Sequence, residues 1–311
     1  MKLALSGATG LVGSRFFDLL KTRYEIIPIT SSAGIDITDR KKIHKFLSGK
    51  NPSLIVHLAA KTNVDACEDD KQADIKKLEK EKALSSSGLD LGNLDPDIWR
   101  DSKSAFGINV IGTKNLADFA ALNGIRIVYV STDFIFNGES DIPYTEDDKA
   151  DPIDWYGQTK YWGEKMLPLS SLITRISYPF GYRSQIKKDL IWTLVELLKN
   201  NPQVALVTDQ VITPTFIDNI VYGIDFLIGK DSSGVFNLVG NNFLSPYEIG
   251  FAIAREFGFP ESKIETTLRA KLYRGRARRP FKVMLKNDKL RHLGFEMTDF
   301  FEALSKIKQS I

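Results

Sequence analysis

A tyrosine and a lysine spaced for joint acid–base chemistry lie in the segment WYGQTKYWGEK, residues 155–165. On a helix, Tyr156 and Lys160 project from one face because they are four residues apart. The ammonium then favours the phenolate and lowers a phenol pKa that is about 10 without neighbours. Thr132, at the end of an earlier apolar run, offers a hydroxyl that can bind a carbonyl oxygen beside the phenol. Together the three residues indicate a site for carbonyl chemistry.

A glycine-rich turn, G-x-x-G-x-x-G, joins the apolar run Lys2–Ser6 to an amphipathic segment that begins at Leu11. Glycines there allow a tight turn and bring backbone N–H groups close to a pyrophosphate at the positive end of a helix. The pattern alone is weak evidence, but its place between a strand and a helix makes it specific. We predict a dinucleotide site at this turn.

The end of the second predicted strand bears on which dinucleotide binds. An acid at this place usually holds the ribose 2′-hydroxyl of NAD. Here the strand ends in Ile29-Thr30-Ser31-Ser32, and the next carboxylate is that of Asp36. A 2′-phosphate therefore meets no repulsion, and the serines, Ser31 among them, can bond it. The sequence favours NADPH, with NADH as the alternative.

Strand-like and helix-like segments alternate along the first part of the chain. The predicted strands are Lys2–Ser6, Tyr24–Thr30, Ser53–Leu58, Ile125–Val130 and Leu172–Ile176. The predicted helices are Leu11–Lys21, Asp39–Leu47, Ser102–Leu122 and Gly157–Leu167. This order predicts an α/β fold, a Rossmann-type doubly wound parallel sheet with helices on both faces.

The alternation is lost toward the C-terminus, where proline and glycine divide the chain into short segments. We expect a smaller C-terminal substrate-binding lobe made of residues 181–212 plus 241–311. The NAD(P)-binding Rossmann domain then takes residues 1–180 plus about 213–240. Within it, the strand-like VFNLVG at 235–240 returns to the main sheet.

Composition excludes several classes of protein. The single cysteine, Cys67, cannot form an internal disulfide, which fits a cytoplasmic location. The three histidines lie far apart and have no metal-ligand spacing, so we expect no metal. No apolar run approaches the roughly 18 residues of a membrane span. The net charge of +3 owes much to an acid-free stretch, 269–282, which suits a small phosphorylated ligand at least as well as a nucleic acid.

The motifs taken together resemble the extended short-chain dehydrogenase/reductase superfamily, and within it the RmlD-like group of dTDP-4-dehydrorhamnose reductases. The matching segments run along nearly the whole chain. They are GATGLVG at 7–13, DITD at 36–39, PSLIVHLAAKTNVDACE at 52–68, STDFIFNG at 131–138, PYTEDD at 143–148, WYGQTKYWGEK at 155–165, TRISYPFG at 174–181, DQVITPT at 209–215 and RRPFKVMLKNDKL at 278–290.

The resemblance implies roles for particular residues. The implied cofactor contacts in the glycine turn are Gly7, Thr9, Gly10, Leu11, Val12 and Gly13, with Gly10, Leu11 and Val12 against the pyrophosphate. Beyond this turn and Ser31, they are Asp36 and Ile37 at the adenine, Ala59, Ala60 and Thr62 in the nicotinamide half, and Asn109, Tyr156 and Lys160. The catalytic group is Thr132, Tyr156 and Lys160. The substrate contacts are Thr132, Asp133, Tyr178 and Arg279.

Several of these residues also have a purely structural interpretation. Asp36 can cap the following helix together with Thr38. Asp133 can be a turn residue, and Tyr178 can pack the junction between the lobes. The basic stretch 269–282 can be a solvated loop. If it binds the diphosphate instead, Arg279 is the best candidate for the contact.

About thirty residues, from Lys71 to about Lys103, are extra relative to the family pattern. One interpretation is a tolerated surface insertion, because lengthening a loop costs little free energy. However, the segment leaves the carboxyl end of the third strand, the side on which ligands bind in such sheets. We therefore favour a lid over the cleft, anchored by Trp99, or a dimer contact beside it.

The activity that the resemblance implies is NAD(P)H-dependent reduction of the C4 ketone of a nucleoside-diphosphate-linked 4-keto-6-deoxysugar, for cell-surface polysaccharide. A homodimer is expected, with no membrane or nucleic-acid partner. Two alternatives stay open. One is a non-catalytic dinucleotide-binding regulatory protein like the β subunit of methionine adenosyltransferase. The other is a different sugar-nucleotide reductase or epimerase of the superfamily.

Overall fold

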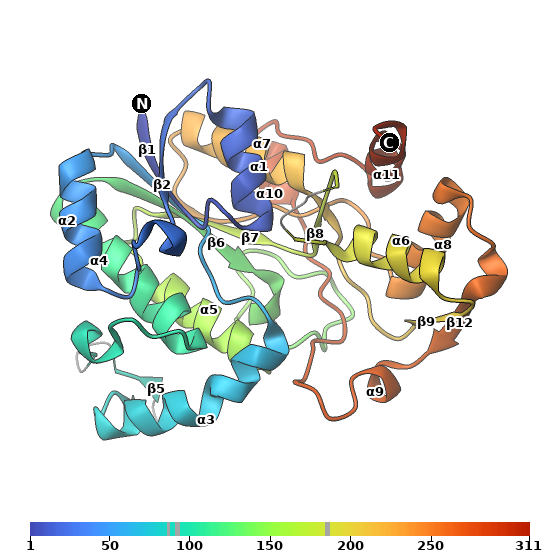
Figure 1. Ribbon diagram of the computed structural model, residues 1–311, viewed down its shortest axis with the longest axis horizontal. Coiled ribbons are helices and arrows are strands. Elements are labelled where there is room, and N and C mark those ends of the chain that lie inside the picture. Colours follow the sequence, from blue (N-terminus) through green and yellow to red (C-terminus); the bar gives the residue numbers. More distant parts are fainter. Residues whose placement is uncertain (86–87, 91–93, 184–186) are drawn as a thin grey trace.

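A computed structural model describes residues 1–85, 88–90, 94–183 and 187–311. A six-stranded sheet with the order β11–β7–β6–β3–β1–β2 lies at its centre, and each neighbouring pair in it is parallel (Figure 1). Its strands are β1 (Lys2–Ser6), β2 (Glu25–Ile29), β3 (Leu54–His57), β6 (Arg126–Thr132), β7 (Leu172–Ile176) and β11 (Gly234–Asn237). The expected Rossmann-type sheet is confirmed, including the return of the chain near 235–240.

Helices cover both faces of this sheet, which explains why its inner strands are continuously apolar. Side chains of α1 (Leu11–Leu20) and α7 (Ile217–Gly229) pack on one face, with Phe16 and Ile220 fully buried. Side chains of α2 (Arg40–Lys50) and α4 (Thr113–Leu122) cover the other face. Within the ranges that the structure describes, no helix has the length and apolarity to cross a membrane.

A second apolar core lies beside the sheet, where the later part of the chain gathers at the right of Figure 1. It is built from helices α6, α8 and α11 and two small parallel strand pairs, β8–β10 and β9–β12. The bounds are β8 (Pro179–Phe180), α6 (Leu190–Asn200), β9 (Val204–Val207), β10 (Thr215–Phe216), α8 (Pro246–Phe257), β12 (Ile264–Thr267), α9 (Arg269–Leu272), α10 (Asp288–His292) and α11 (Phe300–Gln309).

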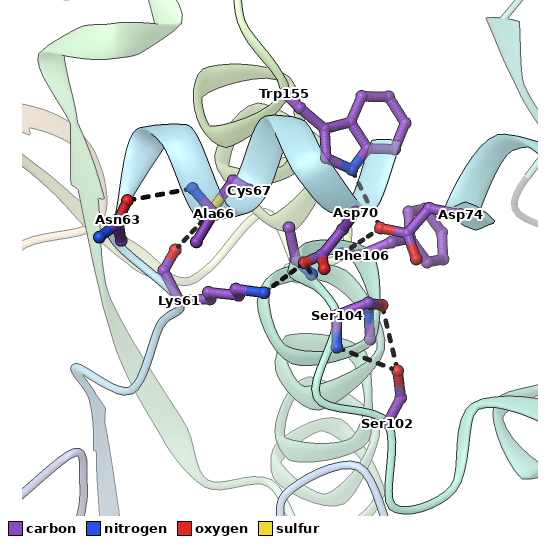
Figure 2. Close-up of polar contacts among 12 residues, drawn as sticks. Lys61, Asn63, Ala66, Cys67, Asp70, Asp74, Ser102, Ser104, Phe106 and Trp155 are labelled. Atoms are coloured by element: carbon purple, nitrogen blue, oxygen red, sulfur yellow. Dashed lines mark hydrogen bonds and ion pairs between the residues drawn. The ribbon is translucent and has the colours of Figure 1, made fainter. Parts of the chain in front are cut away.

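Helix α3 (Val64–Lys80) ties together segments that are distant in sequence (Figure 2). The Asp70 carboxylate accepts hydrogen bonds from Lys61 Nζ at 2.5 Å and from the backbone N–H of Ala105 at 2.7 Å. Lys61 belongs to the loop after β3, and Ala105 begins the helical segment that contains the π-helical turn Gly107–Gly112. One carboxylate therefore fixes a loop and a helix start.

A second carboxylate of α3, that of Asp74, makes the same kind of link to the next helix. It accepts from the backbone N–H of Phe106 at 3.1 Å and from Trp155 Nε1 at 3.0 Å (Figure 2). Trp155 is the first residue of α5 (Trp155–Lys165). Burial raises the pKa of Asp74, although these bonds oppose the shift. Helix α3 thus positions the start of the helix that carries Tyr156.

The segment expected to be an insertion packs into the apolar core that α3 forms with Phe106 and Trp155. Between α3 and the helical segment at Ala105 lie the short hairpin strands β4 (Leu84–Ser85) and β5 (Gly88–Leu89) and a 3-10 turn, Pro96–Trp99. The Trp99 ring is buried, with its centre 4.6 Å from that of Phe106. A loosely attached surface loop does not fit a buried tryptophan, and Trp99 anchors the segment to its own chain.

Replacing Trp99 with alanine should destabilise the fold by about 3–5 kcal/mol, because a large buried ring is removed and a cavity is left. The neighbouring Ile98, 47% exposed, provides the matched control as Ile98→Ala. Urea denaturation of both variants and of the wild type measures the difference. Equal stability of the two variants would contradict the packing described for Trp99.

Candidate active site

The carboxyl ends of the central strands open into a cleft of about 650 Å³. Ligands bind in this crevice in open parallel sheets. Every residue predicted to contact the cofactor lines the cleft, with the exception of Asn109. Thr132, Asp133 and Tyr178 line it as well. The fold therefore brings together predicted site residues that lie between Gly7 and Tyr178 in the sequence.

The turn between β1 and α1 has the geometry that a pyrophosphate requires. Gly7 has φ +72°, and a Cβ on it would lie 2.6 Å from Ala59 N. A Cβ on Gly13 would lie 2.0 Å from the carbonyl oxygen of Gly7. Helix α1 starts after Gly10 without a side-chain cap, so the N–H groups of its first turn remain available to a ligand. These residues fit a bound dinucleotide.

The end of the cleft near β2 is formed by Asp36, whose carboxylate oxygens both accept hydrogen bonds from the protein. Asp36 Oδ1 accepts from the backbone N–H and hydroxyl of Thr38 at 2.9 and 2.8 Å. The cap of α2 is Asp39, whose side chain accepts from Lys42 N, so Asp36 does not have the capping role considered from the sequence. Asp36 Oδ2 accepts from Lys103 Nζ at 2.6 Å. Burial opposes ionisation, but the bonds from Lys103 and Thr38 outweigh it and lower the pKa of Asp36.

Thr132 and Tyr156 meet on one wall of the cleft. Thr132 ends β6, and Tyr156 lies in the first turn of α5, which is capped by Asp154 accepting from Gly157 N at 2.9 Å. Burial raises the pKa of Tyr156 above its usual value, and the nearby Thr132 hydroxyl only partly opposes this. The expected lowering of the phenol pKa is therefore wrong. The phenol is protonated at neutral pH.

Lys160 explains why that expectation fails. Its Nζ donates to the carbonyl oxygen of Val130 at 2.7 Å and lies 3.9 Å from the centre of the Tyr129 ring. Burial lowers the pKa of Lys160 to about 7, although Glu164 opposes the shift. The ammonium therefore turns toward the end of β6. It still lines the cleft, where a ligand can reach its remaining N–H groups.

Asp133 holds the Thr132 hydroxyl from behind. Its Oδ1 accepts from Thr132 Oγ1 at 3.0 Å, and its Oδ2 accepts from Ser177 Oγ at 2.7 Å. Burial raises the pKa of Asp133 to about 6, against the effect of these two bonds. Asp133 begins a 3-10 turn, which agrees with its structural interpretation as a turn residue, and its contact with a substrate stays a prediction.

Asn109 acts behind the cleft. Its Oδ1 accepts from Lys61 N at 2.9 Å, while its Nδ2 donates to Lys61 O at 3.1 Å and to Thr159 Oγ1 at 3.0 Å. Lys61 follows the cofactor-lining residues Ala59 and Ala60, and Thr159 precedes Lys160 on α5. Asn109 is a positioning residue for both walls.

Tyr178 lies in the cleft in a strained backbone conformation. Its φ of +37° lies in the left-handed region, which an aromatic residue rarely adopts. Its hydroxyl accepts from Gln210 Nε2 at 3.4 Å, and Gln210 Oε1 in turn accepts from Tyr273 Oη at 3.4 Å. Strain of this kind persists where the surrounding structure fixes a residue, often at a functional site.

Arg279 lies in a second cavity instead of the main cleft. This cavity measures about 530 Å³, and its basic side chains are Arg269, Arg276, Arg278, Arg279 and Lys282. Arg279 Nη2 donates to Asp65 Oδ2 at 2.8 Å, and Ala277 N donates to Asp65 Oδ1 at 3.0 Å. Arg279 thus fastens the basic loop to the start of α3.

The family profile of the RmlD substrate binding domain matches residues 1–83 and 99–311. The chain belongs to this family. The unmatched stretch, 84–98, is narrower than the insertion expected at 71–103, so α3 and Lys103 belong to the matched framework. Of the described residues between 71 and 103, Ser102 and Lys103 line the cleft, and they do so beside Asp36. The lid and the dimer contact expected for this segment stay predictions.

Individual relatives agree with this assignment. The chain is 27% identical over 312 residues to the spore coat polysaccharide biosynthesis protein SpsK of Bacillus subtilis, covering 99% of this chain and 97% of that protein. A solved dTDP-4-dehydrorhamnose reductase of Clostridium acetobutylicum superposes with a TM-score of 0.83 at 28% identity, covering 100% and 99% of the two chains. The mouse methionine adenosyltransferase 2 subunit beta is 25% identical over 326 residues, covering 100% and 87%.

The RmlD family and the fold are those expected from the sequence. The expected protein class, an NAD(P)-dependent oxidoreductase, is confirmed as well, since relatives of similar identity are named reductases.

The residues of the site that were not predicted include Lys103, Gln210 and Asp65. Gln210 and Asp65 lie within the segments DQVITPT and PSLIVHLAAKTNVDACE, so the motifs themselves held the signal. Lys103 had no local signal, because only the fold brings it to Asp36.

The raised pKa of Asp133 predicts a pH dependence of stability. The folded-state pKa of about 6 exceeds the unfolded value of about 4, so the folded state binds the proton more tightly. Protonation of Asp133 contributes its full stabilisation of the folded state below about pH 4, and this stabilisation is lost as the pH rises through about 6. Between about pH 4.5 and 7.5 the wild type should lose about 2 kcal/mol more stability than Asp133→Asn. The variant also loses hydrogen bonds, which changes its free energy of unfolding by a similar amount at every pH and leaves the pH dependence unchanged.

Urea denaturation at several pH values measures this difference, with the exposed Asp147→Asn as the control that keeps the wild-type slope. Parallel curves for the wild type and Asp133→Asn would show that Asp133 is ionised across the range.

Proposed function

We propose that the protein reduces the C4 ketone of a nucleoside-diphosphate-linked 4-keto-6-deoxysugar with a nicotinamide dinucleotide. The observation that carries the proposal is that Thr132 and Tyr156 line the same cleft as the glycine turn, together with Lys160. The kinship to dTDP-4-dehydrorhamnose reductases supports the substrate class. The dinucleotide, when bound, supplies the hydride.

Tyr156 donates the proton in this reaction. Its raised pKa keeps the phenol protonated at neutral pH, which is the form that a general acid needs. The proton moves from the phenolic oxygen to the carbonyl oxygen as negative charge develops there. The Lys160 ammonium, held at Val130, would donate its remaining N–H groups to the ribose of a bound dinucleotide.

Thr132 and Asp133 stabilise the same oxygen. In the structure the Thr132 hydroxyl donates to Asp133. With a pKa raised to about 6, a minor fraction of Asp133 is protonated near neutral pH, and in that form the carboxyl can donate to Thr132 Oγ1 instead. The Thr132 hydrogen is then free to point into the cleft and bond the carbonyl oxygen, a contact that strengthens as charge grows on it.

The basic cavity is suited to the nucleoside diphosphate. Hydrogen bonds through Gln210 connect Tyr178, which lines the main cleft, with Tyr273, which lines this second cavity. The two cavities therefore lie on either side of these three side chains. A sugar beside Tyr178 therefore directs its diphosphate toward Arg276 and Arg278. Guanidinium groups bind phosphate oxygens in pairs, which suits this part of the substrate.

The relationship to the methionine adenosyltransferase β subunit supports a second candidate, a non-catalytic dinucleotide-binding role. NADPH consumption with a panel of nucleotide-linked 4-keto sugars separates the two. Turnover of one of them supports the reductase. Dinucleotide binding without turnover of any sugar supports the regulatory role.

Replacing Tyr156 with phenylalanine should lower the turnover of the accepted sugar about 10²–10⁴-fold, because the ring stays and the transferable proton is lost. Dinucleotide affinity and thermal stability should stay at the wild-type level. Tyr161→Phe, on the same helix and outside the cleft lining, is the control. Wild-type turnover in Tyr156→Phe would remove this residue from the mechanism.

Replacing both Arg276 and Arg278 with alanine should raise the KM for the sugar nucleotide about tenfold or more, with little change in dinucleotide affinity. Both side chains are exposed and line the basic cavity. Arg274 is exposed on the same loop but does not line that cavity, so Arg274→Ala is the matched control. Equal KM values in the two variants would place the diphosphate elsewhere.

A further inference from the structure

Lys103 places a cation at the end of the cleft near β2. Its Nζ bonds Asp36 Oδ2, and both residues line the cleft with Thr30 and Ser31. We propose that Lys103 recognises the 2′-phosphate of NADPH and so sets the preference for the phosphorylated dinucleotide. This inference rests on the proposed function only in taking a dinucleotide as the ligand.

The loop after β2 brings the cation to the required place. Ile35 N donates to the carbonyl oxygen of Thr30 at 3.2 Å, and Ala33 N donates to Thr30 Oγ1 at 3.3 Å. The loop therefore folds back on the end of the strand and carries Asp36 there. In dinucleotide-binding sheets, the ribose 2′ position lies at the end of the second strand.

The charges at this end favour a phosphate. A free Asp36 carboxylate would repel it, but both of its oxygens are bonded, to Thr38 and to Lys103. An ammonium has three N–H groups, so Lys103 can keep Asp36 and still donate to a phosphate oxygen. Its side chain is 73% exposed, which leaves the other N–H groups accessible.

The other lysines of the described cleft lining are bonded elsewhere. Lys160 Nζ donates to Val130 O at 2.7 Å, and Lys187 Nζ donates to Thr62 Oγ1 at 3.3 Å. Thr62 follows β3, and Val130 belongs to β6, so neither contact is with the loop after β2. Among the described lining residues, Lys103 is therefore the cation bonded to that loop.

The backbone of Lys103 is fixed on both sides. Before it, Trp99 is buried in the core. After it, Ser104 N donates to Ser102 Oγ at 3.3 Å, and Ala105 N donates to Asp70 of α3 (Figure 2). A cation on a fixed backbone loses little freedom on binding a ligand, and the ligand then gains more from the contact.

The test compares two probes, adenosine 2′,5′-bisphosphate and AMP, by isothermal titration of the wild type and of Lys103→Met. Methionine keeps the length of the side chain and removes the charge. The variant should bind the bisphosphate at least about tenfold more weakly and AMP within about twofold of the wild type. Lys103→Arg should restore most of the lost affinity, and Lys41→Met, on the exposed face of α2, should change neither.

Other results overturn the inference. Unchanged bisphosphate binding in Lys103→Met would show that the cation does not reach the phosphate. Equal weakening of both probes would assign Lys103 a role in holding the adenosine end as a whole. If the wild type binds neither probe nor NADPH, the proposed function itself fails, which is a different result.

Discussion

The buried side-chain amide of Asn109 is the contact on which the geometry of the site depends. It is 1% exposed, and its oxygen and nitrogen make three hydrogen bonds, two to the backbone of Lys61 and one to Thr159. A buried amide that lost one of these partners would keep its full desolvation cost. The loop after β3 and the helix that carries Tyr156 are therefore held in one relative position.

The same network extends to the glycine turn. Thr113 Oγ1 donates to Asn109 O at 2.7 Å and lies 3.0 Å from His57 Nε2, and His57 Nδ1 lies 2.6 Å from Ser6 Oγ. Since the Thr113 hydrogen is used on Asn109, His57 Nε2 must donate and Nδ1 must accept. Burial lowers the pKa of His57 to about 3, so the chain of bonds stays uncharged. Because Ser6 directly precedes Gly7, these hydrogen bonds connect the glycine turn with α5, the helix that carries Tyr156.

The parts of the molecule that were predictable from the sequence are those set by local chemistry. Fully buried strands such as β3 produce apolar runs, and the turn around Gly7 admits only glycine because a Cβ would strike Ala59. The sequence did not reveal the tertiary contacts. Lys160 turns to a carbonyl of β6, Arg279 pairs with Asp65 on α3, and Lys103 bonds Asp36 at the end of the cleft near β2. Spacing along one helix cannot reveal such partners.

The pKa shifts of Asp133 and Lys160 have the same physical cause. Burial raises the pKa of Asp133 to about 6 and lowers that of Lys160 to about 7, so both lean toward their neutral forms. Asp133 accepts from Thr132 and Ser177, and Lys160 donates to Val130, but these bonds offset only part of the cost of burying each charge. An anionic ligand changes this balance for Lys160, because a nearby negative charge favours the ammonium. A dinucleotide bound in the cleft would therefore favour the charged form of Lys160.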